Sequence, residues 1–121
     1  MANTFKVVTF AADPNSAGTP YVVYTAGSGV TAVVLGLILT NINTAQVTAE
    51  VELVSDTGSR GGSNDVTNGT AFLAKDIPIP VGSSVELLAG NKVVLETTDQ
   101  IRIDCSVADK LSGALSIMEI T

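Results

Sequence analysis

The sequence lacks histidine and tryptophan altogether and has a single cysteine among its 121 residues. Without histidine, the Ser–His and Cys–His nucleophile systems cannot be assembled from this chain. Zinc sites need several Cys or His side chains, and a lone cysteine also excludes an intrachain disulfide. Carboxylate pairs such as Glu50 and Glu52 are typical of a sheet surface. We therefore predict that the chain is not an enzyme and binds no cofactor or metal.

The one cysteine, Cys105, lies in the alternating run "IRIDCSV". A period of two places it on the same face as Ile101, Ile103 and Val107. A reactive thiol would need a nearby base or cation to lower its pKa. The pattern instead predicts a buried small apolar side chain.

Charged residues are scarce, at 15% against the roughly 25% that is usual for soluble domains. The chain has 12 acidic and 6 basic residues, and the basic ones are scattered along it. Binding to nucleic acid or to anionic lipid needs clustered Lys and Arg, so we expect neither partner. The longest apolar run, "TAVVLGLIL", is shorter than the roughly 20 residues of a membrane-spanning helix, and the N-terminus shows no signal peptide. We expect a soluble protein made in a cytoplasm.

Aliphatic residues dominate, because 45% of the chain is hydrophobic and only 4% is aromatic. This excess predicts either a large aliphatic core or an apolar surface that a partner covers. Most of the apolar residues alternate with polar ones at a period of two, which is typical of strands. The predicted strands are Thr4–Phe10, Tyr21–Ala26, Thr31–Ile42, Gln46–Val54 and Thr70–Pro80, followed by 83–89, 92–97, 101–108 and 114–121.

Eight or nine short strands at this spacing predict an all-β fold: an antiparallel sandwich, jelly-roll-like or a small barrel. The segment Thr31–Ile42 is apolar on both faces, which predicts a central strand covered on both sides, with a bulge near Gly36. Prolines at the end of Thr70–Pro80 predict a sheet edge or a crossover there. A Gly90–Asn91 turn predicts a hairpin between 83–89 and 92–97.

The predicted strand Gln46–Val54 has one face that is expected to contact solvent. In Gln46–Val54 the predicted core-facing residues are Val47, Ala49, Val51 and Leu53, and the predicted solvent-facing residues are Thr48, Glu50 and Glu52. A short helical turn is expected at most in "VADKLSGA".

The chain is long enough for one domain, spanning residues 1–121, with a long polar loop over 55–69. Two interpretations of the N-terminus compete. In the first, Thr4–Phe10 is an outer strand of its own sandwich. In the second, residues 1–19 form an arm whose strand pairs with a neighbouring subunit or a shell protein by strand addition.

Several blocks of the sequence carry a resemblance: "MANTFK", "VVYTA", "TAVVLGLILTNI", "KDIPIPVGSSVELLAGNKVVLE" and "LSIMEIT". Together they resemble small β-rich virion structural proteins of tailed bacteriophages of the cyanophage and marine phage type. The resemblance implies a structural component of the virion, made in the cytoplasm of a bacterial host. It leaves open a capsid decoration (cement) protein and a neck, collar or tail accessory protein.

The decoration role is the one we predict, with a carbohydrate-binding sandwich as an alternative of a different class. Decoration proteins implied by this resemblance self-associate, with a trimer favoured, and bind the major capsid protein; neck or tail proteins are the partners under the alternative role. The hypothetical assembly contacts are Phe5, Val7, Phe10, Leu35, Leu37, Ile77 and Ile79.

Overall fold

The computed structural model describes residues 2–55, 69–88 and 92–121. These residues form nine strands, and no helix long and apolar enough to cross a membrane is found among them. The strands are β1 (Asn3–Phe10), β2 (Tyr21–Thr25), β3 (Thr31–Asn41), β4 (Val47–Ser55), β5 (Gly69–Ile79), β6 (Ser84–Leu87), β7 (Val93–Leu95), β8 (Gln100–Cys105) and β9 (Leu111–Ile120). The predicted all-β fold is confirmed.

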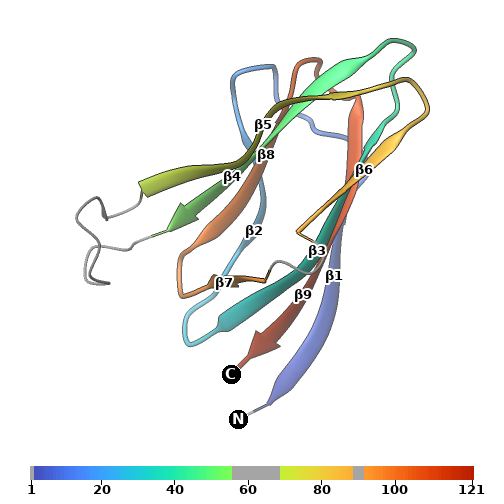
Figure 1. Cartoon of the computed structure of the whole chain (residues 1–121). Helices are drawn as coiled ribbons and strands as arrows, with labels where there is room; N and C mark the ends of the chain where they lie inside the picture. The colour runs from blue at the N-terminus through green and yellow to red at the C-terminus, as the bar shows by residue number, and fades with distance from the viewer. Residues whose placement is uncertain (1, 56–68, 89–91) are drawn as a thin grey trace.

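Two antiparallel sheets face each other as a sandwich (Figure 1). Sheet A has the order β1-β9-β3-β6, and β7 pairs with the part of β3 that β6 leaves free. Sheet B has the order β2-β8-β4-β5. Strands from the two halves of the chain pair with each other in a nested order: β1 pairs with β9, β2 with β8, β3 with β6 and β7, and β4 with β5. The chain is thus a long hairpin wrapped over two layers, which is a jelly-roll arrangement and not a closed barrel.

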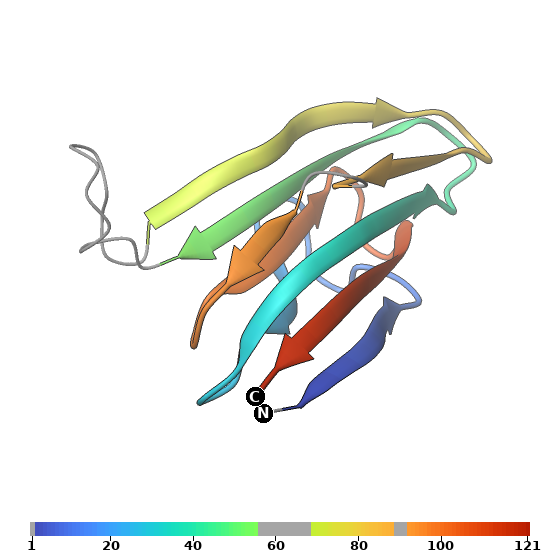
Figure 2. The ribbon, with the colours of Figure 1, turned by 60° about the horizontal axis from the view of Figure 1, so that its bottom comes forward.

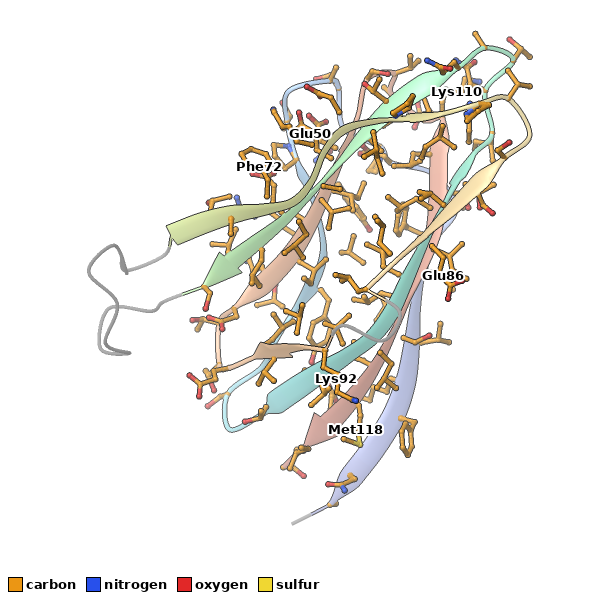
Figure 3. All side chains as sticks on the ribbon, in the orientation of Figure 1. Glu50, Phe72, Glu86, Lys92, Lys110 and Met118 are labelled. Atoms are coloured by element: carbon orange, nitrogen blue, oxygen red, sulfur yellow. The ribbon has the colours of Figure 1, made fainter. Side chains whose placement is uncertain are left out.

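The space between the sheets is filled by aliphatic side chains (Figure 3). Most of the largest fully buried ones come from β3, β8 and β9, among them Leu37, Leu39, Ile101, Ile103 and Leu115. Cys105 lies among them, with burial raising the pKa of its thiol, so its predicted burial is confirmed.

The bulge predicted near Gly36 is present. Val34 lies opposite Ile117 of β9 and Gly36 lies opposite Ser116, so β3 holds one extra residue, Leu35. The extra residue changes the phase of the alternation, because a shift of one residue turns every later side chain to the other face. Before the bulge, even-numbered residues such as Val34 face the core; after it, odd-numbered residues such as Leu37 do.

The predicted hairpin between β6 and β7 is wrong. Both strands pair antiparallel with β3, β6 along Leu37–Thr40 and β7 along Ala32–Val34. They therefore run in the same direction, as two pieces of one edge of sheet A. The proposed Gly90–Asn91 turn lies outside the described residues, as do residues 56–68 of the predicted loop.

Two burial predictions also need correction. Val107 was expected on the buried face with Cys105, but β8 ends at Cys105 and Val107 is 40% exposed in the turn that follows. Glu52 was expected in water, and it is only 8% exposed. It does face outward, but β4 is an interior strand, and Glu52 lies between Arg102 of β8 and Phe72 of β5.

The proline-rich end of β5 lies at an edge of sheet B, as predicted, and Ile77 and Ile79 both point toward the core. At the N-terminus, β1 is an outer strand of the chain's own sheet A, paired with β9 along its whole length. The chain ends lie side by side, because Ala2 exchanges two backbone hydrogen bonds with Thr121 (Figure 1).

Gly113 of β9 shows how closely the core is packed. It lies opposite Phe10, and a Cβ placed on it would stand 2.5 Å from Cζ of that ring and 2.7 Å from the carbonyl oxygen of Ile38. Neither contact is sterically allowed, and the Phe10 ring is itself held against Tyr21 at 5.7 Å between centroids. Glycine is therefore required at this position.

We expect Gly113→Ala to lower the free energy of unfolding by about 1–3 kcal/mol, because an added methyl group overpacks this site. Gly36→Ala is the matched control, since a Cβ at Gly36 meets nothing within 4 Å and its φ is not positive. Urea unfolding of both variants would measure the difference. Equal stabilities for the two variants would contradict the packing described here.

Candidate assembly surfaces

The hypothetical assembly residues divide between the core and the surface. Phe10, Leu37 and Ile79 are buried in the core, and Ile77 is half-buried against it. Their side chains are engaged within the chain's own fold.

The other three lie at the surface. Phe5 is 72% exposed and Val7 is 62% exposed, and Leu35 is exposed at the β3 bulge. Of the seven hypothetical assembly residues, only these three are therefore exposed enough to contact another protein.

These exposed residues belong to a larger apolar surface on the side of sheet A that faces away from the core. The strand registers place Phe5, Met118, Val33 and Val94 in one row across β1, β9, β3 and β7. We call the surface the outer apolar face; its residues are Phe5, Val7, Val33, Leu35, Ile38, Val94 and Met118. Ile38 is 45% exposed and lies between Ala114 of β9 and Glu86 of β6.

Sequence reasoning predicted that β3 is covered on both faces, but within the described residues only its core face is covered. No described part of the chain covers Leu35 or Ile38, which remain exposed. Val33, Ile38, Val94 and Met118 were missed as candidates. The two-sided apolar pattern of Thr31–Ile42 was the available signal, because a strand with only one core face does not need apolar residues on both sides.

The opposite side of the molecule, the outer face of sheet B, is polar. Figure 3 shows Met118 and Glu86 on one side of the sandwich and Phe72 and Glu50 on the other. Glu50 accepts a hydrogen bond from Lys75 at 2.6 Å, and the Lys75 ammonium lies 4.6 Å from the centre of the Phe72 ring. Lys75 thus pairs with two side chains of this polar face, one charged and one aromatic.

A cavity of about 210 Å³ on the sheet B face is lined by the carboxylates of Glu50, Asp76 and Asp104. Asp104 is 9% exposed; its Oδ2 accepts a bond from the Gly18 amide at 3.0 Å, while its Oδ1 is buried without a partner. Among the described residues, no group of three or more potential ligands is placed to hold a metal ion. We assign no ligand to this cavity.

Asp13 is a fully buried carboxylate in the connection between β1 and β2. It accepts hydrogen bonds from the amides of Asn15 at 3.0 Å and Cys105 at 3.2 Å, and its own amide donates to Leu111. Burial raises the pKa of this carboxyl above its usual value. These bonds fasten the connection to β8 and β9, so residues 11–13 are held against the body of the sandwich.

A polar group links the two sheets beside β1. Glu119 of β9 binds the Lys6 ammonium at 2.7 Å and accepts a hydrogen bond from the Tyr24 hydroxyl of β2 at 2.6 Å. Lys6, and to a smaller extent Tyr24, hold the pKa of the Glu119 carboxyl below its usual value. Burial and this carboxylate raise the pKa of Tyr24. Glu119 thus couples β1 of sheet A to β2 of sheet B.

The comparison with protein-family models finds no match for this chain, and neither does the comparison with curated protein sequences. Solved structures do share its fold. A chain of the T13 particle of infectious bursal disease virus matches 97% of this chain with a TM-score of 0.54 and 14% identity. VP2 of the subviral particle of the same virus matches 96% with a TM-score of 0.50 and 15% identity. The present chain spans only 30% and 32% of those two chains.

We expect Glu119→Gln to lower stability at pH 7 by up to about 1 kcal/mol, since the ion pair with Lys6 is partly exposed. Because the pKa of Glu119 is depressed, its contribution is fully present above the ordinary value of 4.5 and is lost as the pH falls through the lower, folded-state value. Thermal unfolding across pH 2–7 should therefore show wild type and variant converging as the pH falls below 4.5.

Glu86→Gln on the outer face of sheet A is the control for that experiment. Taking the difference between wild type and variant cancels the opposite trend from Asp13. A difference between wild type and Glu119→Gln that stayed constant down to pH 2 would contradict the assigned ion pair.

Proposed function

We propose that this chain is a non-enzymatic structural protein of a virion, and that it is a capsid decoration protein bound to the shell formed by the major capsid protein. It would reach the virion after synthesis in the cytoplasm of a bacterial host. The outer apolar face is the surface that we assign to shell binding. Binding of this kind needs shape and apolar contact, and it needs no reacting group.

The observation that carries the proposal is the outer apolar face itself. It crosses four strands of one sheet, and Phe5, Ile38 and Val94 are among its exposed members. Contiguous apolar patches on soluble proteins mark surfaces that bind other proteins or membranes. The chain carries six scattered basic residues against 12 acidic ones, so a protein partner is favoured over an anionic membrane.

The fold supports the same class of function. The jelly roll is shared with chains of particles of infectious bursal disease virus, although at 14–15% identity the likeness concerns the fold alone. Those neighbours give no support to a tailed-bacteriophage origin in particular, so that origin stays a prediction from the sequence blocks. The trimer expected for decoration proteins likewise rests on analogy.

The closely packed aliphatic interior suits a role under mechanical load. Aliphatic side chains from both sheets interdigitate, and Glu119 and Asp13 fasten the connections between the sheets. A decoration protein of this build would oppose the outward pressure of packaged DNA by bridging neighbouring shell subunits. A neck, collar or tail accessory protein would use the same face against a different partner.

A carbohydrate-binding function is disfavoured by where the aromatic residues lie. Phe10 is buried and Tyr24 is bonded to Glu119. The strongly exposed rings, Phe5 and Phe72, belong to different sheets on opposite sides of the molecule. A sugar-stacking platform needs rings on one surface, and these two cannot share one.

We expect Ile38→Lys to abolish binding to the shell while leaving the fold intact. The new ammonium lies opposite Ala114 and beside Glu86, so the sheet accepts it, but it places a charge on the outer apolar face. Shells of the major capsid protein assembled without this chain would be incubated with wild type or variant and sedimented. Wild type should co-sediment and the variant should stay in solution.

Val107→Lys is the matched control, because Val107 is similarly exposed, at 40%, but lies in the turn after β8. It should bind like the wild type. Equal binding by Ile38→Lys would remove the outer apolar face from the proposal. Wild type that failed to bind shells would overturn the decoration role, and an electron-microscopy map of the virion would then test the neck and tail alternatives.

A further inference from the structure

The four edges of the two sheets are not equally protected against pairing with another strand. Natural sheets block their edges with prolines, bulges, charges or short strands. In sheet B, β5 contains Pro78 and two register shifts, and β2 has only five residues, a register shift and Pro20 directly before it. In sheet A, one edge is divided into the short strands β6 and β7.

The remaining edge, β1, has none of these protections. It has eight residues without a proline, and its register with β9 is unbroken from Asn3 to Phe10. Its single charged residue, Lys6, is engaged with Glu119 of its own chain. Figure 2 shows β1 as the outermost ribbon of sheet A, beside β9.

The backbone groups that β1 leaves open can be identified. Ala2 and Thr121 exchange both of their hydrogen bonds, so they form a hydrogen-bonded pair. Such pairs alternate with non-bonded pairs along an antiparallel ladder. In the unbroken register, the even-numbered residues of β1 therefore bond to β9, and Asn3, Phe5, Val7 and Thr9 direct their N–H and C=O groups toward the open edge.

We propose that β1 is a dimerisation edge, at which β1 of a second copy adds in the antiparallel direction across a two-fold axis. Two facing residues can exchange hydrogen bonds only if both have open groups, so odd-numbered residues must face odd-numbered ones. With the axis through Lys6, the whole segment Asn3–Thr9 overlaps: Phe5 of each copy faces Val7 of the other, and Asn3 faces Thr9.

The side chains favour a second copy as the occupant of this edge. In the register above, Phe5 and Val7 form aromatic and β-branched cross-strand pairs on the outer face, which is a stabilising combination. The two Lys6 residues face each other at the axis, and each keeps its charge paired with Glu119 at 2.7 Å. The other edges of the chain are blocked, so β1 of one copy finds its unprotected counterpart in β1 of another.

This interface is isologous, so it closes at two copies and does not generate a trimer. It also does not rest on the virion proposal, because it uses only open backbone groups and the side chains of β1. A measurement on the purified protein without any shell tests it separately from the decoration role.

The test uses proline at positions where the N–H is open. Proline is tolerated on an edge strand when its nitrogen faces solvent. Val7→Pro and Thr9→Pro should therefore keep the β1–β9 ladder and remove donors that the second copy needs. Val8→Pro is the matched control, since Val8 bonds to β9, and it should lower the melting temperature of the monomer.

Analytical ultracentrifugation at micromolar concentration should give twice the chain mass of 12.3 kDa for wild type. Val7→Pro and Thr9→Pro should give a folded monomer with a nearly unchanged circular dichroism spectrum. Residue-resolved hydrogen exchange should show the amides of Phe5, Val7 and Thr9 protected in wild type. In each proline variant the amides that remain, Phe5 and either Val7 or Thr9, should be unprotected.

A monomeric or trimeric wild type would overturn the proposal. So would a dimer that persists in both folded proline variants, or rapid exchange of the three odd-numbered amides in a dimeric wild type. If one of the two variants fails to fold, the other decides between these outcomes.

Discussion

The extra residue in β3 is the constraint on which the rest of the structure depends. β3 lies at the centre of sheet A, paired with β9 on one side and with β6 and β7 on the other. If it had no bulge, one uninterrupted alternation would place Val34 and Leu37 on opposite faces. The extra Leu35 lets both side chains enter the core and turns Leu35 itself toward the surface. The same residue thus completes the aliphatic core and helps to form the outer apolar face.

Much of the fold follows from local pattern. Period-two alternation located the strands, the prolines located the β5 edge, and Gly36 located the bulge, because each of these signals is a property of one short segment. The hairpin assigned to β6 and β7 failed for the opposite reason. Two short segments separated by a Gly-Asn pair are compatible with a hairpin, and only the long-range pairing of both with β3 decides against it. The burial of Glu52 escaped prediction similarly, because it depends on its neighbours Arg102 and Phe72 in two other strands.

The candidate surface was predictable only in part. The composition predicted either a large aliphatic core or an apolar surface, and Phe5, Val7 and Leu35 are exposed, while their role as assembly contacts stays a prediction. Phe10, Leu37 and Ile79 have the same apolar character and lie in the core. Which apolar residue faces which way depends on strand register and on the β3 bulge. For Met118 and Val94, membership in the row across sheet A depends on pairings between segments far apart in the sequence.

The two proposed interfaces share residues and would reinforce each other. Phe5 and Val7 belong both to the outer apolar face and to the open edge of β1, since their side chains point outward and their backbone groups point sideways. In an antiparallel pair, facing residues lie on the same side of the sheet. A two-fold pairing through β1 therefore places the outer apolar faces of both copies on one side, as a single surface across two sandwiches. A dimer that presents two such faces can engage two neighbouring shell subunits at once, and the second contact then forms at a high effective concentration. Under both proposals, weak apolar contact by each copy would be sufficient for firm attachment to the shell, without any charged or reacting group.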